Sequence, residues 1–485
     1  MKKQLSIQFI CVVICFTLSG ISTALAQKHS ENNKAQEIAK VLRLFHQQGK
    51  FNGTALIVEK GQVLYKGSFG FESVAAKKPI TSQSCFYLAS VTKTFTATAI
   101  IKLQEQGKLQ YDHSIARYLP KLSHYKAITI RHLLNHTSGI PDYEGWYEAL
   151  YGLKKEDKSA DYAQLFAKKW KTKLLTNEII IEILRKYRPA LNFAKDEKFE
   201  YSNTNYILLA SIVARVSGMS FAQFLKQYLF EPAGMRSAYV YHLGMKKSPQ
   251  NRVYGFKTEK GQRISNDLIF MDGVVGDGNV YASAEDLLKW DEALYTEKII
   301  KNTSKELAFV PGVLNNGEST HYGFGWAIMK PEQNIMHLGQ WAGFQSAFER
   351  DMQNHNTIIL IDNSTSEVNF NACYGIMRAI LAGREYKMPQ KYTEISLPVT
   401  TLQKYVGKYA LSAKTMLDVT LEGNQLYAQA SHQPKLPIFP VTAQKFFFKV
   451  ADIQITFVKD AQGKVDQLLV HRQGRDFPAK KVTSK

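Results

Sequence analysis

FYLASVTKTFTATAIIKLQEQG (residues 86–107) carries the strongest structural signal in this chain. Its apolar residues recur at helical spacing, and Gly107 supplies a C-terminal stop. Ser90 and Lys93 lie three positions apart, so on a helix the hydroxyl and the amine share a face. If Ser90 opens the helix, its backbone N–H is free to donate to an oxyanion. We interpret Ser90 as the candidate nucleophile and Lys93 as the group that takes its proton.

The S-x-x-K spacing alone is weak evidence, because the chain holds a second copy at Ser123 and Lys126. The setting separates the two copies. Ser90 lies between a strand-like apolar run and a long helix, whereas Ser123 follows Pro120 in a polar connection. We therefore expect only Ser90 to be reactive.

The N-terminus has the pattern of a signal peptide. Lys2 and Lys3 precede an apolar run at 7–16, and Ala-Leu-Ala at 24–26 matches a cleavage site. This predicts a signal peptide over 1–26 and a mature protein that is periplasmic or secreted, without stable membrane insertion. Cleavage would leave Cys85 and Cys373, which either form one bridge or remain two buried thiols; we favour the thiols.

Charge and histidine pattern limit the partners. The formal net charge is +20, which suits an anionic envelope, but the lysines are scattered rather than gathered in one basic stripe. We therefore expect no nucleic-acid partner. The twelve histidines show no H-E-x-x-H spacing, which disfavours a metal hydrolase.

Two further motifs with candidate site residues follow along the chain. Tyr201 and Asn203 precede an amphipathic helix, where a phenol can carry a proton and an amide can bind a substrate carbonyl. The alternative is a strand-end aromatic and a helix cap. Of three H-x-G triplets, the one at His337 is the candidate, because Gly339 and Gly343 would keep its strand edge bare enough for a substrate.

With S-x-x-K, Y-x-N and H-x-G in this order, residues 35–385 resemble the serine beta-lactamase and penicillin-binding-protein superfamily. The similarity is to its class C beta-lactamase and D-alanyl-D-alanine carboxypeptidase branch, peptidase family S12. Framing segments such as LLNHTSGI, GFGW and the GDGN loop support it. The resemblance implies an α/β (α+β) domain with an antiparallel sheet flanked by helices, and no metal or organic cofactor.

The resemblance also implies roles. Ser90 would be acylated with Lys93 as its base, and Tyr201 would shuttle the proton, although which of Lys93 and Tyr201 is the base stays open. Asn203 would bind substrate amide, and His337 would take the strand position held elsewhere by the lysine of K-T-G. Gly339 would border the substrate on that strand. Gln340 would add its N–H to the oxyanion hole.

Leu338 departs from this pattern. Many members of the superfamily carry threonine or serine there, and the hydroxyl binds a substrate carboxylate. An alkyl group cannot replace a charge-assisted hydrogen bond of roughly 1.5–3 kcal/mol. We therefore expect weak beta-lactamase and carboxypeptidase activity and a preference for uncharged esters or amides.

From residue 391 onward the sequence consists of short runs in which apolar and polar residues alternate, separated by turn residues. This pattern predicts an all-β domain. It resembles the small lipocalin-like barrel of many relatives. We therefore expect a hydrolase domain over 27–390 and a β-domain over 391–485. The role of the second domain, as a cover of the site or a stabilising appendage, stays open.

The sequence thus predicts an exported serine hydrolase that cleaves ester or amide bonds of small or peptide-like substrates. One alternative is a D-alanyl-D-alanine carboxypeptidase, a D-amino-acid peptidase or a beta-lactamase acting on cell-wall fragments or their analogues. Another is a non-catalytic envelope protein that binds peptidoglycan-like ligands.

Overall fold

A computed structural model describes residues 33–482, with gaps at 153–160, 260, 330–333, 389–393, 413–414, 432, 434, 449–452 and 473–474. The predicted signal peptide lies outside the described residues. The chain divides into two compact units, the first reaching Thr365 and including Met377–Glu385, the second comprising Ser366–Ile376 and Tyr386–Lys485.

A six-stranded sheet in the order β2-β1-β11-β10-β9-β8 forms the centre of the first unit, and every pairing in it is antiparallel. Strands β1, β10 and β11 are buried along most of their length, which requires cover on both faces of the sheet. The bounds are β1 (Gly53–Glu59), β2 (Gln62–Ser68), β8 (Ala327–Met329), β9 (Asn334–Trp341), β10 (Phe344–Asp351) and β11 (Asn356–Asp362).

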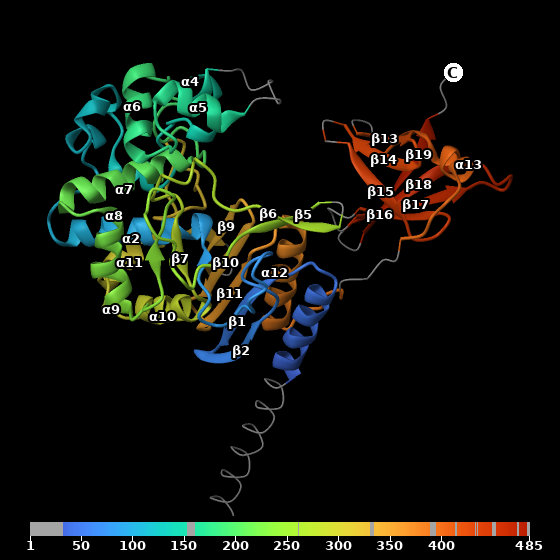
Figure 1. The fold of residues 1–485 in the computed structure, drawn as a ribbon, viewed down its shortest axis with the longest axis horizontal. Helices are drawn as coiled ribbons and strands as arrows, with labels where there is room; N and C mark the ends of the chain where they lie inside the picture. Colours follow the sequence, from blue (N-terminus) through green and yellow to red (C-terminus); the bar gives the residue numbers. More distant parts are fainter. Residues whose placement is uncertain are drawn as a thin grey trace, which may run out of the picture. The chain divides into compact units, whose positions relative to one another are not determined.

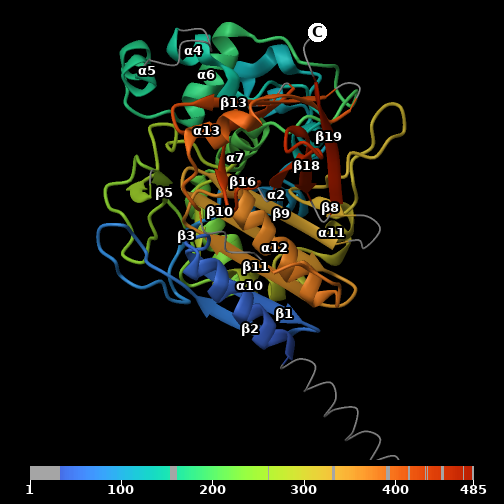
Figure 2. The same cartoon turned by 90° about the vertical axis from the view of Figure 1, so that its right-hand side faces the viewer.

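Helices supply that cover. A helix over 33–47 lies on one side of the sheet, and α2 (Thr92–Glu105) and α10 (Ala284–Leu294) lie on the other (Figure 1). The first helix runs beside the β1–β2 hairpin (Figure 2), where Lys34 pairs with Glu59 at 2.5 Å. The sequence-based expectation of an antiparallel sheet flanked by helices is therefore confirmed.

A buried ion pair joins α10 to the sheet. Arg350 of β10 and Asp291 of α10 are 0% and 2% exposed and bond directly through Nε and Oδ1. Thr357 donates to the second oxygen of Asp291 at 2.7 Å. Because both charges are out of water, removing either partner would leave the other uncompensated.

The remaining elements form a helical region and two small sheets. The helices of that region are α3 (Ile130–Leu134), α4 (Tyr147–Tyr151), α5 (Tyr162–Trp170), α6 (Asn177–Tyr187), α7 (Asn203–Ser217), α8 (Phe221–Leu225), α9 (Glu231–Ala233) and α11 (Asn302–Ala308). Helix α12 (Glu367–Leu381) contains residues of both units, because the division between them falls after Ile376. The small sheets are β3 (Phe86–Tyr87), β7 (Val280–Ala282) and β4 (Tyr239–Val240), and β5 (Phe256–Glu259) with β6 (Gln262–Ser265).

Within the described residues, no single helix is long and apolar enough to cross a membrane. The helical segments Asn203–Ser217 and Phe221–Ala233 are together long and apolar enough to do so, but the chain bends by 78° between them. The two cysteines among the described residues, Cys85 and Cys373, are buried thiols, and no disulfide joins them.

The second unit contains a closed antiparallel barrel of eight strands, in which β12 pairs with both β13 and β19. Alternate side chains such as Tyr409, Phe446 and Phe457 fill its interior. The barrel-like domain expected from the sequence is thus confirmed. Its elements are α13 (Val399–Leu402), β12 (Gly407–Ala410), β13 (Met416–Glu422), β14 (Gln425–Ala430), β15 (Leu436–Pro440), β16 (Lys445–Phe448), β17 (Ile453–Lys459), β18 (Val465–Arg472) and β19 (Arg475–Val482).

Candidate active site

Ser90 and Lys93 are in direct contact. Ser90 sits in a 3-10 turn, η1 (Ala89–Val91), and α2 begins only at Thr92. Ser90 therefore lies in the 3-10 turn that precedes the α-helix, two residues before the first helical residue, and does not itself begin the helix. The expected i, i+3 contact is present, with Lys93 Nζ 3.0 Å from Ser90 Oγ.

Lys93 is fully buried and has two other fixed acceptors. Its Nζ donates to Asn203 Oδ1 at 2.7 Å and to the Asp277 carbonyl oxygen at 3.0 Å. With two N–H bonds fixed in this way, the remaining tetrahedral direction of the nitrogen faces Ser90. In the neutral amine that direction holds the lone pair. The geometry therefore lets Lys93 accept the Ser90 proton without rearranging its other contacts.

Close packing against β9 holds the Ser90 turn. Gly339 lies so near this turn that a methyl group in place of its hydrogen would overlap the Leu88 carbonyl oxygen. Ser346 of β10 donates to the same oxygen at 2.6 Å. Ala89 has φ +47°, a strained value for a residue with a side chain. The glycine thus serves close packing, whereas the sequence suggested that it kept a strand edge bare.

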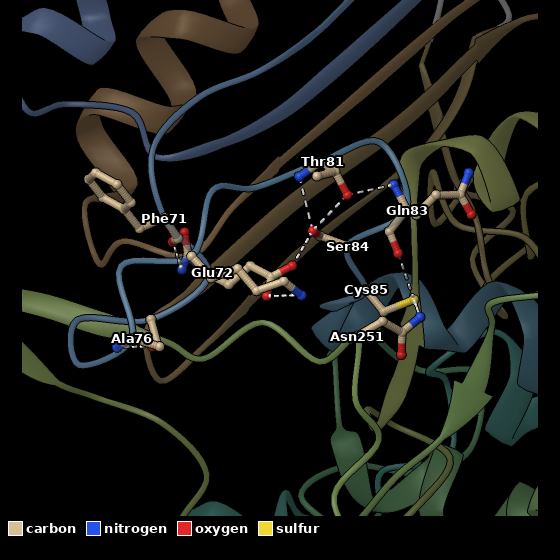
Figure 3. Close-up of polar contacts among 11 residues, drawn as sticks. Phe71, Glu72, Ala76, Thr81, Gln83, Ser84, Cys85 and Asn251 are labelled. Carbon is tan, nitrogen blue, oxygen red and sulfur yellow. Dashed lines mark hydrogen bonds and ion pairs between the residues drawn. The ribbon is translucent and has the colours of Figure 1, made fainter.

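The segment leading into this turn is anchored by side chains (Figure 3). Ser84 donates to the buried Glu72 at 2.5 Å, and its hydroxyl accepts from the Thr81 N–H at 3.0 Å. Asn251 donates to the sulfur of Cys85 at 3.0 Å. Burial, followed by two nearby carboxylates, raises the pKa of the Cys85 thiol. Cys85 is therefore an unreactive thiol that supports the loop.

Tyr201 stands over Lys93, with its ring centroid 4.9 Å from Nζ, and is 36% exposed. Its ring packs on His136, a buried residue that sequence reasoning did not single out, at 4.4 Å. His136 Nδ1 accepts from the Ser202 N–H at 3.1 Å, so it positions the Y-x-N turn. Burial, then the nearby Lys93, lowers the pKa of His136 well below its usual value.

Asn203 is the first residue of α7 and is held by two carboxylates. Its backbone N–H donates to Asp142 Oδ2 at 2.6 Å, and its Nδ2 donates to Glu144 Oε1 at 3.0 Å. These contacts turn the amide oxygen toward Lys93. The resemblance implies that Asn203 binds substrate amide, but here its Nδ2 is already engaged by Glu144.

His337 is 5% exposed, and both of its ring nitrogens are engaged. Nδ1 is 2.7 Å from the Leu338 carbonyl oxygen, which can only accept, so Nδ1 carries the proton and Nε2 accepts from the Tyr322 hydroxyl at 2.9 Å. Burial, then the charge of Lys93, lowers the pKa of His337 to about 3. The imidazole is therefore neutral and turned inward.

The backbone of β9 provides the open edge. Among the described residues, strand β8 pairs with β9 at residues 334–336 and leaves the rest of β9 uncovered on that edge. On the other edge, the two-residue turn at 342–343 sets the register between β9 and β10. In that ladder the Trp341–Phe344 pair exchanges hydrogen bonds, so the N–H of Gln340 points away from β10. Leu338 and Gln340 are exposed on the face opposite His337.

A small cavity of about 40 Å³ adjoins the nucleophile. Predicted site residues Ser90, Asn203 and Gln340 line it, together with further residues Tyr87, Ala89, Tyr143, Glu144, Asp272, Val274, Asp277, Gly278, Asn279 and Trp341. The three acidic residues in this lining were missed at the sequence level. The GDGN loop was noticed as a framing segment, yet a lone acid in a glycine-rich loop carries no functional signal of its own.

Within the part of the chain that the structure describes, Lys93 is the one basic side chain that the electrostatics of Asp142, Glu144 and Asp277 involve. Within the described residues, none of Asp142, Glu144, Asp272 and Asp277 forms an ion pair. Burial raises the pKa of Asp277 to about 6 and that of Asp272 to about 7, and it also raises the pKa of Asp142. The part of the chain that the structure describes contains no group of three or more His, Cys, Asp or Glu side chains placed to hold a metal ion.

The alternative motifs lie apart from this arrangement. Ser123 and Lys126 are both exposed on a surface turn. His321 is exposed, and His242 accepts from the nearby Gly244 N–H at 3.1 Å.

Comparison with known proteins agrees with the geometry. The Beta-lactamase family model matches residues 38–389, and the model of a domain of unknown function, DUF3471, matches residues 392–481. The chain belongs to the beta-lactamase family. This family member is 34% identical over 448 residues to penicillin-binding protein 4* of Bacillus subtilis, covering 88% of this chain and 94% of that protein.

Solved structures extend the likeness. The crystal structure of a penicillin-binding protein from Bacillus halodurans is 26% identical, with a TM-score of 0.58, over 70% of this chain and 99% of that one. The octameric penicillin-binding protein homologue from Pyrococcus abyssi shares the fold at 24% identity and a TM-score of 0.63, over 92% and 99% of the two chains.

Proposed function

We propose that this protein is a serine hydrolase that cleaves ester or amide bonds through an acyl-enzyme on Ser90. The observation that carries the proposal is the hydrogen bond of 3.0 Å between Ser90 Oγ and a buried Lys93 whose other contacts are fixed by Asn203 and Asp277. A serine beside a buried amine with one direction left open is arranged for nucleophilic attack.

Acylation begins when Ser90 Oγ attacks the substrate carbonyl carbon and its proton passes to Lys93 Nζ. The developing oxyanion lies between the N–H of Ser90, at the start of a helical turn, and the outward N–H of Gln340. As the tetrahedral intermediate collapses, the proton passes to the leaving oxygen or nitrogen, and Tyr201 above Lys93 can carry it. Water then attacks the ester carbon, and its proton returns to Ser90 Oγ as the acid leaves.

Small or peptide-like esters and amides are the proposed substrates. Leu338 offers no hydroxyl for a substrate carboxylate and is 37% exposed beside Gln340. Penicillin hydrolysis and D-alanyl-D-alanine carboxypeptidase action, which both need that carboxylate bound, are the alternative. The pattern at residues 1–26 supports export to the periplasm or the medium as part of the proposal, with cell-wall fragments as natural partners.

Intact mass measurement tests the nucleophile. The mature protein and Ser90→Ala are incubated separately with a fluorophosphonate and with a penicillin. We expect one fluorophosphonate adduct that is lost in the variant, and little penicillin adduct. An adduct that persists in Ser90→Ala would remove Ser90 from its role, and rapid penicillin turnover would favour the alternative. With no adduct at all, the non-catalytic binding protein becomes the better hypothesis.

A further inference from the structure

A second and larger cavity lies apart from Ser90, between the loop at 71–77 and the β5–β6 hairpin. Its volume is about 420 Å³, against about 40 Å³ beside the nucleophile, and this size is usual for a small-molecule site. Among the described residues, none lines both cavities. The wall of the larger one includes Asn52, Phe71, Val74, Lys77, Phe256 and Arg263.

The described wall of this cavity carries two positive charges and no acidic side chain. Lys77 belongs to the loop and Arg263 to β6, and neither forms an ion pair within the described part of the chain. The nearby acids Glu72 and Glu259 pair with other lysines, at 2.9 and 2.5 Å. A single exposed cation is commonly unpaired, but two on one cavity wall without an acid create a local positive potential.

One buried carboxylate, that of Asp362, is close enough to sense Arg263. Asp362 is 1% exposed, and its oxygens accept from the Ser364 hydroxyl at 2.5 Å and from the Asn52 N–H at 3.3 Å. Burial raises its pKa to about 7, while those hydrogen bonds and then the charge of Arg263 oppose the rise. Asp362 is therefore only partly ionised at neutral pH, and it leaves the guanidinium available to a ligand.

The apolar part of the wall is exposed and held in place. Phe71 and Val74 are 39% and 36% exposed. The Arg263 guanidinium lies 5.0 Å from the ring centroid of Phe256. Asn52, which is 2% exposed, donates to the Phe71 carbonyl oxygen at 2.9 Å and accepts from the Phe71 N–H at 3.2 Å. An apolar ligand would thus remove exposed side chains from water without having to order them first.

The loop that bears Lys77 is closed on itself (Figure 3). The N–H of Glu72 donates to the Lys78 carbonyl oxygen at 2.7 Å, and the N–H of Ala76 donates to Ser73 Oγ at 3.0 Å. These bonds tie the two ends of the loop to each other. The cavity is therefore formed before a ligand binds, which lowers the entropic cost of binding.

We propose that this cavity binds a small organic anion, a carboxylate on an apolar body. The carboxylate lies between Lys77 and Arg263, where a guanidinium can bond both of its oxygens. The apolar body covers Phe71, Val74 and the Phe256 ring. This is a binding site additional to the proposed hydrolysis, and it does not depend on Ser90.

Charge and size distinguish this ligand from others. Two positive charges repel a cation, and a neutral apolar compound leaves both of them unused. Phosphate groups are commonly held by several backbone N–H groups at a helix N-terminus, and no helix begins in the described wall. A singly charged carboxylate with a ring or a short chain matches one lysine and one arginine and fits in about 420 Å³.

Two ligands with the same body test the proposal. 3-Phenylpropanoate carries a carboxylate where 3-phenylpropan-1-ol carries a neutral hydroxymethyl group. The Kd of each for the full mature chain is measured by ligand-observed NMR titration at about pH 7, where the carboxylate is ionised. We expect the carboxylate to bind about tenfold or more tightly than the alcohol, and the difference to shrink in about 0.5 M salt, which screens exposed charges.

Variants locate the binding. Lys77→Gln and Arg263→Gln should each weaken carboxylate binding severalfold and leave alcohol binding unchanged; both side chains are exposed, so folding is not at risk. Val74→Asp places a negative charge in the wall and should weaken carboxylate binding the most. Lys126→Gln, which removes an exposed lysine from a surface turn, is the matched control and should leave both Kd values unchanged.

Three results would overturn the proposal. One is an equal Kd for the two ligands. Another is no saturable carboxylate binding up to about 10 mM, above the Kd expected for a ligand of this size. The third is carboxylate binding that survives both Arg263→Gln and Val74→Asp, which would place the ligand elsewhere, including beside Ser90. None of these results bears on the fluorophosphonate adduct, so the proposed hydrolase function stands or falls separately.

Discussion

Replacing Asp277 with asparagine should stabilise the ligand-free protein above pH 6. Burial, the largest cause, raises the pKa of this carboxyl from 3.8 to about 6, so the native state holds its proton more tightly than the unfolded chain does. Well below pH 3.8 the carboxyl is protonated in both states and there is no penalty. Stability is lost as pH rises from 3.8 to about 6, and the loss is constant above that. Linkage gives a penalty of about 3 kcal/mol at pH 8 and about half of that at pH 5.

Asparagine has nearly the same shape and stays neutral, but burying its amide costs about 1 kcal/mol. We therefore expect a net gain of about 2 kcal/mol at pH 8 that shrinks by about 1.5 kcal/mol at pH 5. Besides burial, the Asp142 carboxylate raises the pKa of Asp277, whereas Lys93 and the backbone N–H groups of Asp277 and Gly278 lower it, and the Tyr143 hydroxyl donates to Asp277 Oδ2 at 3.3 Å.

Urea unfolding followed by tryptophan fluorescence measures this gain. All five tryptophans lie between residues 146 and 341, so the signal reports the first unit alone. Glu318→Gln, which removes one negative charge from an exposed turn, is the control and should change little. A loss of stability at pH 8, or a difference between Asp277→Asn and the native protein that is equal at pH 5 and pH 8, would refute the reasoning. Either result would mean that the contacts of the ionised carboxylate outweigh the cost of its burial.

Three other substitutions test the scaffold and the specificity. Gly339→Ala should lower kcat and cost about 1–3 kcal/mol of stability, because the added methyl group would overlap the turn that bears the nucleophile. Gly375→Ala, on the open side of α12, is the control and should do neither. Equal effects of the two variants in activity assays and urea unfolding would contradict this. Asp291→Ala should cost about 3–5 kcal/mol in the same unfolding assay because it leaves Arg350 buried and uncompensated, and a loss under 1 kcal/mol would show that the pair is dispensable. Leu338→Thr should raise penicillin kcat/KM by about tenfold or more, and an unchanged value would mean that the missing hydroxyl does not limit penicillin turnover.

Local sequence sufficed for features that lie within a few residues of one another. The contact of Ser90 with Lys93 follows from helical spacing. The eight-stranded barrel followed from alternation and turn residues. In both cases the periodicity of the backbone fixes which side chains share a face.

Features that need distant segments were not predictable in this way. Asn203 reaches Lys93 across 110 positions, and the Asp277 carbonyl does so across 184. His337 was expected at the substrate edge, but its side chain turns inward to Tyr322, because in a strand neighbouring side chains alternate between faces and only the tertiary fold decides which face is covered. An isolated acid in a loop is usually a solvated side chain, so the convergence of three acids could not be read from the chain.

The Asp277 side chain is separable from the contact that its backbone makes. Lys93 needs the backbone oxygen of Asp277, and any residue with the same backbone could supply it. The carboxylate is therefore not required for that contact, yet its burial destabilises the fold by about 3 kcal/mol at neutral pH, because the charged form loses its hydration.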